Sequence, residues 1–145
     1  MNRCGGRLAL ALCVLPALRC ATVYSRGIVR DGAGAPVGGA MVRLLGSGGG
    51  TVASTLTDAH GCFFLQRTAP RGEKRFTLEI GADRYKAARL DVPLQPPILL
   101  AILVPDSSDG ESRIRTTTAS ERSDVWERQC IPLFAGGGAQ SLGPN

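Results

Sequence analysis

Few side chains in this 145-residue sequence could support catalysis or hold a metal. His60 is the only histidine, whereas protein zinc sites usually need three or four ligands. A Ser-His-Asp triad would also depend on His60, and no nucleophile elbow accompanies it. No Lys-Ser/Thr pair follows Gly48–Gly50, so this run does not predict a phosphate-binding loop. The spacing of Asp106, Asp109 and Glu111 lacks the bidentate glutamate of a calcium loop. The sequence therefore predicts a protein that is not an enzyme, with no catalytic residue, metal ligand or cofactor site.

The N-terminal residues 1–21 have the pattern of a secretory signal peptide. Arg3 and Arg7 form a basic start, and the apolar run Leu8–Leu18 is too short to span a bilayer. A buried N-terminal helix is the structural alternative. Lipid attachment at Cys20 is weakly supported, because larger residues precede it than a lipidated cysteine normally has. We expect a secreted, periplasmic or cell-surface protein with no stable transmembrane segment after signal removal.

Removal of the signal changes the charge of the chain. Residues 1–21 contain three arginines and no acid, so the net charge falls from +5 to +2. The remaining basic residues are scattered, without a basic run or interleaved aromatic residues. Nucleic acid is therefore excluded as the expected partner.

The cysteines lead to a tentative disulfide. Cys62 and Cys130 remain after signal removal, and an oxidising compartment favours their pairing. Two alternatives stay open at this point. Cys62 could be a buried core residue with Cys130 a free thiol, or Cys130 could pair with Cys20 if cleavage spares it.

Seven short apolar or alternating segments predict an all-β, antiparallel sandwich over residues 22–105, and no helix of consequence is expected anywhere after the signal. The expected strands are Val23–Arg30, Ala40–Leu45, Thr51–Thr57, Cys62–Gln66, Arg75–Ile80, Tyr85–Val92 and Ile98–Val104.

Turn residues separate these strands, and a different composition follows them. Asp31 with Gly34, and Asp58 with Gly61, are expected to form structural turns. Residues 106–145 predict a polar, flexible tail. Within that tail, residues 125–134 form a short apolar patch that could dock on the sandwich, and Trp126 is a tentative interaction residue.

Four motifs occur in a fixed order: V-x-D-x-x-G, P-V-x-G-A-x-V-x-L, T-x-T-D-x-x-G-x-F, and a glycine followed by F-x-L. Their residues are Val29, Asp31, Gly34, Pro36, Val37, Gly39, Ala40, Val42, Leu44, Thr55, Thr57, Asp58, Gly61, Phe63, Gly72, Phe76 and Leu78. This pattern resembles the carboxypeptidase regulatory-like domain, a transthyretin-like (prealbumin-like) β-sandwich. The resemblance covers about residues 24–104 and implies structural rather than catalytic roles for these positions.

The sequence departs from that family in two places, and one of them is the loop Thr68–Lys74, which is more basic than usual. Asp83 and Arg84 precede Tyr85, where the family often has a glycine. Two enzyme groups that the fold resembles are excluded by their residue requirements. Intradiol dioxygenases need two histidines and two tyrosines for iron, and hydroxyisourate hydrolases need several histidines and a C-terminal Y-R-G-S.

Two function hypotheses follow. The first is a non-enzymatic, exported accessory module that binds a protein or glycan partner at the cell envelope, as the resemblance implies. The second is a structural interaction protein of an envelope assembly, acting through an exposed edge strand and the tail around Trp126. Few aromatic residues are available for a surface, which disfavours the glycan.

Overall fold

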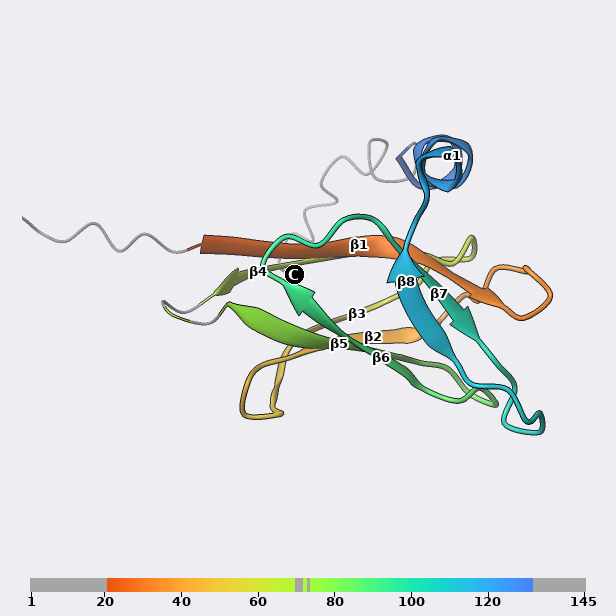
Figure 1. Ribbon diagram of the computed structural model, residues 1–145, viewed down its shortest axis with the longest axis horizontal. Coiled ribbons are helices and arrows are strands. Elements are labelled where there is room, and N and C mark those ends of the chain that lie inside the picture. Colours follow the sequence, from red (N-terminus) through yellow and green to blue (C-terminus); the bar gives the residue numbers. More distant parts are fainter. Residues whose placement is uncertain (1–20, 70–71, 73, 132–145) are drawn as a thin grey trace, which may run out of the picture.

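Two four-stranded sheets pack face to face in the computed structural model, which describes residues 21–69, 72 and 74–131 (Figure 1). The first sheet has the order β4 (Cys62–Ala69), β1 (Ala21–Asp31), β7 (Leu99–Leu103) and β8 (Arg113–Thr116). The second has the order β3 (Thr51–Leu56), β2 (Met41–Leu45), β5 (Arg75–Gly81) and β6 (Ala88–Pro93). The expectation of an all-β, two-sheet sandwich is confirmed.

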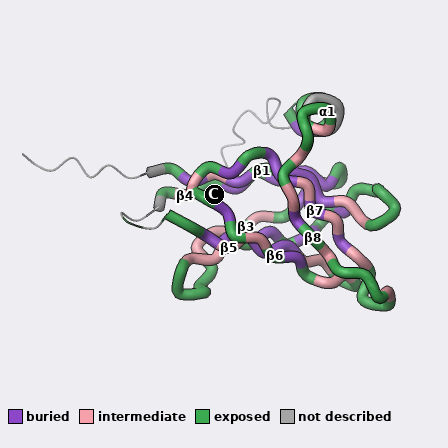
Figure 2. The backbone as a smooth tube through the Cα atoms, viewed as in Figure 1, coloured by how far each residue is buried: buried purple, intermediate pink, exposed green. Residues whose placement is uncertain are grey.

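The core lies between the sheets and is aliphatic apart from a few phenylalanines (Figure 2). Strand alternation produces it: in β2, Val42 and Leu44 are fully buried, whereas Met41 and Arg43 point to the other side. The largest completely buried core side chains are Phe63, Leu44, Leu78, Ile80, Leu99, Leu103, Val23, Val29, Val42 and Val92. Each such burial contributes about 1.5–3 kcal/mol.

The strand prediction was wrong in two details. An eighth strand, β8, lies in the segment expected to be a polar tail, and it pairs with β7. Only Ile114 of this strand faces the core, so its sequence carries almost no hydrophobic signal. The sandwich is also not purely antiparallel, because β1 and β7 run parallel. Five strands separate β1 from β7 along the chain, and local patterns do not reveal such a pairing.

The expectation of no significant helix was also wrong. Helix α1 (Ala119–Glu121) continues directly into the π-helix η1 (Arg122–Cys130). Thr118 and Glu121 form a capping box at its start, in which each residue binds the other's backbone N–H. The T-x-x-E spacing of these two residues is the sequence signal for this helix. None of the helices in the described part of the chain is long and apolar enough to cross a membrane.

One turn of the second sheet has an unusual backbone conformation. Among the described non-glycine residues, only Arg84 has a positive φ, at 69°. It lies between β5 and β6, at the turn where a glycine is expected from the family pattern. The Arg84 carbonyl accepts a hydrogen bond from the Asp106 N–H at 2.9 Å, and Tyr85 bridges to Pro105. The β7–β8 connection thus holds a left-handed residue that has a side chain.

We predict that the free energy of unfolding is about 1 kcal/mol larger for Arg84→Gly than for Arg84→Ala, so the glycine variant is the more stable one. The reason is that glycine adopts this positive φ without steric cost. Both variants remove the guanidinium, so urea denaturation of the pair isolates the backbone effect. Asp83→Gly in the same turn is the control and should be less stable than the wild type, since Asp83 has no positive φ. Equal stabilities of the two Arg84 variants would contradict the strain.

Candidate functional site

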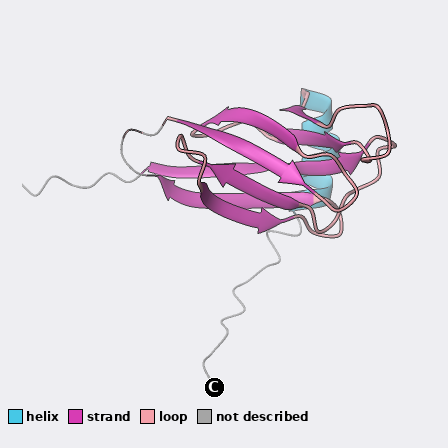
Figure 3. Cartoon of the chain, turned by 90° about the horizontal axis from the view of Figure 1, so that it is seen from below, coloured by secondary structure: helices cyan, strands magenta, loops and turns pink. Residues whose placement is uncertain are grey.

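The helical segment lies across the outer face of the first sheet (Figures 1 and 3). It follows edge strand β8, passes over β7 and β1, and ends beside the other edge strand, β4. Figure 3 shows the helix crossing the strands on one side of the sandwich. We call residues 119–130 the strap helix, since it connects the two edges of this sheet.

A disulfide holds the C-terminal end of the strap helix. Cys62 of β4 and Cys130 of η1 are joined by an S–S bond of 2.03 Å, with their Cα atoms 5.7 Å apart. Both cysteines are almost completely buried. The bond therefore lies under the helix, away from solvent.

Trp126 packs under the middle of the strap helix. Its side chain is 4% exposed and belongs to a second hydrophobic cluster with Ile28, Cys62, Ile98 and Cys130. Trp126 and Cys130 are four residues apart, so they lie on the same face of the helix. The outer face of the first sheet is thereby partly converted into a small second core.

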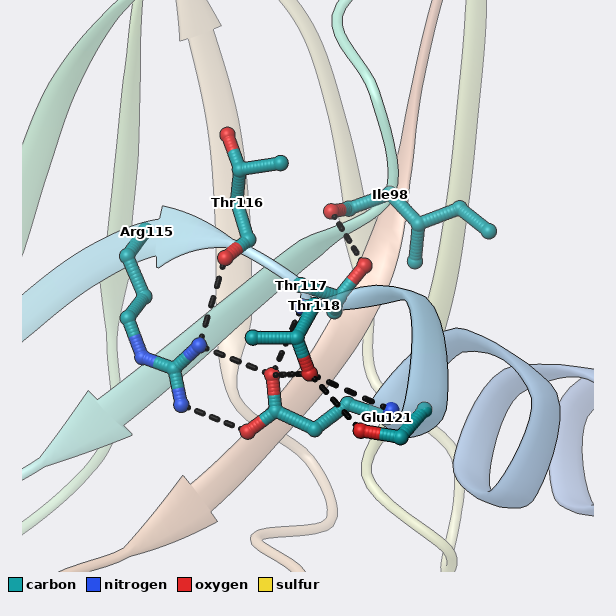
Figure 4. A network of polar contacts seen from close by, with 7 residues as sticks. Ile98, Arg115, Thr116, Thr117, Thr118 and Glu121 are labelled. Atoms are coloured by element: carbon teal, nitrogen blue, oxygen red, sulfur yellow. Dashed lines mark hydrogen bonds and ion pairs between the residues drawn. The ribbon is translucent and has the colours of Figure 1, made fainter.

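A network of polar contacts fixes the N-terminal end of the strap helix (Figure 4). Arg115 of β8 donates two hydrogen bonds to Glu121, from Nη2 to Oε1 at 2.6 Å and from Nη1 to Oε2 at 2.8 Å. The Thr118 N–H donates to Glu121 Oε2 at 2.8 Å, and Thr117 donates from Oγ1 to the Ile98 carbonyl at 3.0 Å. The bonds from Arg115 and then from Thr118 lower the pKa of Glu121 to about 2.

A pocket of about 180 Å³ remains between the strap helix and the sheet. Apolar side chains form most of its wall, and polar or charged groups stand at its rim; the lining residues are Ile28, Arg30, Ile98, Leu100, Thr117, Glu121 and Trp126. A shallower hollow of about 430 Å³ adjoins it along β7 and shares Arg30, Leu100 and Glu121 with it. An apolar wall with polar groups at its rim is an arrangement suited to binding a small molecule.

The four turn residues singled out in the sequence hold backbone, and two of them, Asp31 and Gly34, also line the adjoining hollow. Asp31 Oδ1 accepts the N–H groups of Ala33 and Ala35, each at 2.9 Å, and Gly34 has a φ of 87°. Asp58 Oδ1 accepts from His60 at 2.8 Å and from Cys62 at 2.9 Å.

Gly61 completes the second of these turns. Its φ is 76°, and a Cβ atom here would lie 2.3 Å from the Val29 carbonyl oxygen. No other residue type fits without moving β1. This turn places Cys62 at the start of β4, within reach of Cys130.

Other sequence expectations have different outcomes. Trp126 was named as an interaction residue of the tail, and the structure places its indole in the second cluster, where it is buried against the sheet. The signal segment, Cys20 and residues 132–134 of the apolar patch lie outside the described residues. His60 is exposed in its turn, and within the described ranges no group of three His, Cys, Asp or Glu side chains could hold a metal. Arg30, Arg115 and Glu121 were missed as site residues.

Comparisons with known proteins bear on the sandwich itself. Residues 26–97 match the family model of the carboxypeptidase regulatory-like domain. The chain carries a carboxypeptidase regulatory-like domain. Its fold is the two-sheet β-sandwich expected from the sequence motifs. β7, β8 and the strap helix lie beyond the matched residues.

Solved structures with a similar backbone include two enzymes. Klebsiella pneumoniae 5-hydroxyisourate hydrolase has a TM-score of 0.49 and 20% identity, over 68% of this chain and 94% of that one. The 3-chlorocatechol 1,2-dioxygenase from Rhodococcus opacus 1CP has a TM-score of 0.42 and 12% identity, over 70% of this chain and 62% of that one. No curated protein matches the chain.

We predict that the double variant Cys62→Ala/Cys130→Ala is less stable than the oxidised regulatory-like domain. The cysteines are 68 residues apart, and closing a loop of that length stabilises by up to about 4 kcal/mol. Urea denaturation followed by the fluorescence of Trp126, the only tryptophan, measures the difference. A reductant should lower the stability of the wild type and leave the double variant unchanged. An oxidised wild type without a Cys62–Cys130 peptide in non-reducing mapping would contradict the pairing.

We also predict that acid loosens the strap helix. A carboxylate whose pKa falls on folding stabilises the folded state above its unfolded pKa, about 4.3. That stabilisation is lost as the pH falls from about 4 towards the folded value of about 2. Trp126 fluorescence should therefore shift to longer wavelength over this interval in the wild type. Glu121→Gln should lack this component, and parallel titration curves for the two proteins would contradict the prediction.

Proposed function

We propose that this chain is a non-enzymatic, exported β-sandwich module that binds a protein partner through the outer face of its second sheet. The observation that supports the proposal is an adjacent pair of exposed apolar side chains on that face. Met41 of β2 and Leu56 of β3 are cross-strand partners and are 42% and 56% exposed. They line a shallow hollow of about 600 Å³ floored partly by the backbone of Gly39 and Gly81.

A ladder of charges lies next to this apolar pair. Glu79 of β5 stands between Arg43 of β2 and Arg89 of β6, its cross-strand neighbours. It contacts Arg43 Nη2 at 2.7 Å and Arg89 Nε at 2.6 Å. The Glu79 side chain is only 8% exposed, whereas those of Arg43 and Arg89 are 50% and 68% exposed.

The composition of this face indicates the kind of partner. Methionine, arginine and tyrosine are enriched in protein interfaces, and Tyr85 also lines the hollow. Two arginines share one carboxylate in the ladder, which leaves one positive charge in excess. We therefore expect a protein segment with an apolar side chain over Met41 and Leu56 and an acidic group near the arginines. Asp83 also lines the hollow, but it follows the end of β5. We therefore expect it to lie away from the acidic group of the partner and not to repel it.

The non-enzymatic part of the proposal rests on residue chemistry. The described residues offer no cluster of three metal-ligating side chains, and His60, the only histidine, is exposed in a turn. A hydrolase or oxidoreductase turnover that one point substitution abolishes would refute this part. The proposed export is supported by the buried disulfide, since such bonds persist in oxidising compartments.

An edge strand offers a second route to an envelope assembly. Leu56 lies at the end of β3, an edge strand of the second sheet, so added pairing there would cover it. Trp126 has no part in this alternative, because it is buried.

We predict that a photo-crosslinking residue at position 56 gives a discrete product with one protein in the native host. The same residue at Ala119, an exposed position on the strap helix, is the matched control on the opposite side. Met41→Asp should abolish the product and weaken binding of the purified partner at least tenfold. The reason is that burying a methionine side chain under the partner contributes about 1.5–3 kcal/mol to binding. Ala119→Asp should change neither. A product that persists with Met41→Asp, or none from position 56, would contradict the proposed face.

A further inference from the structure

The pocket under the strap helix has the shape of a small ligand site. Its walls are the indole of Trp126 and the aliphatic side chains of Ile28, Ile98 and Leu100. Its volume of about 180 Å³ is enough for one six-membered ring or a short alkyl chain, given that an apolar cavity of about 150 Å³ holds benzene. It opens at Arg30 and Glu121, which it shares with the adjoining hollow along β7.

The two charged residues at this opening differ in how far hydrogen bonds within the fold compensate their charges. Glu121 accepts two hydrogen bonds from Arg115 and one from the Thr118 N–H, so its charge is compensated within the fold. Arg30 donates only two long hydrogen bonds, to the Gly34 carbonyl at 3.2 Å and to Gln129 Oε1 at 3.3 Å. Both acceptors are neutral, and no carboxylate among the described residues forms an ion pair with Arg30.

We propose that this pocket binds a carboxylate carried on a small apolar group, with the apolar part against Trp126 and the carboxylate on Arg30. The guanidinium fork of arginine matches a carboxylate in geometry, and two parallel hydrogen bonds would replace the long ones to neutral oxygens. The disulfide and the Glu121 network hold the helix wall of the pocket in place before the ligand arrives, which reduces the ordering cost of binding.

The charges that line the adjoining hollow are balanced, so the preference for an anion rests on Arg30 at the pocket opening. The adjoining hollow is lined by Arg113 and Arg115 as well as by Asp31 and Glu111. Arg115 is committed to Glu121, and one oxygen of Asp31 holds the backbone of its own turn. Arg113 pairs across the ladder with Ile102, whose other neighbour is Arg30, so two arginines flank the apolar stripe of β7.

Two sources could supply this chemistry: a free aromatic or short aliphatic acid, or the C-terminus of a peptide that ends in an apolar residue. The carboxylate and the apolar group are common to both. They differ in the extra chain, which a peptide would have to lay along the hollow beside Leu100 and Ile102.

The test uses the oxidised mature protein, with phenylacetate as the probe and phenylacetamide as its neutral isostere. Trp126 fluorescence and titration calorimetry at pH 7 report binding, since the only tryptophan lines the pocket. Phenylacetate should bind with a Kd on the order of 1 mM or tighter, as expected for a ligand of this size. Phenylacetamide should bind at least tenfold more weakly.

Three variants separate binding in the pocket from a general effect of positive charge. Arg30→Gln should reduce phenylacetate binding at least tenfold, to the level of the amide. Arg113 lines only the adjoining hollow, so Arg113→Gln should change the affinity for phenylacetate by less than twofold. Leu100→Phe fills the pocket and should abolish binding of both compounds. Equal binding of acid and amide, an unchanged affinity in Arg30→Gln, or no binding of phenylacetate to the wild type would each overturn the proposal.

A peptide arm then distinguishes the sources. Acetyl-Gly-Gly-Phe with a free carboxylate is compared with phenylacetate, and its C-terminal amide serves as the control. Tighter binding of the free peptide that Arg30→Gln removes supports a peptide C-terminus. Weaker binding of the peptide than of phenylacetate supports a free acid. Peptide binding that is insensitive both to amidation and to Arg30→Gln would count against a carboxylate site.

Discussion

The structure depends on covering both faces of its first sheet. One face packs against the second sheet, as in any sandwich, but Ile28 and Ile98 make the other face apolar as well. A sheet with two apolar faces needs a second layer, because exposed apolar area of this kind is unfavourable in water. The strap helix supplies that layer, and Cys62–Cys130 fixes it to β4. The disulfide is thus part of the packing of the domain.

The helix and the sheet need each other. A helix of about a dozen residues is marginal by itself in water, and most of this one has π geometry, which is rare outside packed structures. Its ends are held by different bonds, a bidentate ion pair at Glu121 and a disulfide at Cys130. Among the described helix side chains between these ends, Trp126 is the one that is buried, and its indole does not fill the space completely. The pocket beside Arg30 is the volume that remains.

The sequence predicted the sandwich because its strands obey local rules. Alternation in β2 and β5 and the Asp-Gly turns at Asp58 and Gly61 act over a few residues, so they are readable from the chain. The parallel pairing of β1 with β7 is non-local and was missed. β8 was missed because its four residues show no hydrophobic alternation. Ile114 alone faces the core, and Arg115 on the other face binds Glu121 of the helix.

The site was harder to predict than the fold. Trp126 was named as an interaction residue within a short apolar patch of the tail, and the structure buries its indole against the first sheet. The T-x-x-E capping signal at Thr118 and the four-residue spacing of Trp126 and Cys130 together identify an amphipathic helix. Arg30 carries no such signal. Its role depends on which charges Arg115 and Glu121 already satisfy, and that is a property of the assembled sheet.

The two outer faces of the sandwich differ in what covers them, and the partners proposed for them differ accordingly. On the first sheet the helix leaves a small pocket that opens at Arg30, and its volume suits the small carboxylate proposed above. On the second sheet the Arg43–Glu79–Arg89 ladder occupies the centre, and Met41 and Leu56 remain exposed beside it. A buried carboxylate between two arginines keeps those side chains extended over the sheet. The apolar pair therefore stays accessible, on a flat surface of the kind that a protein can cover.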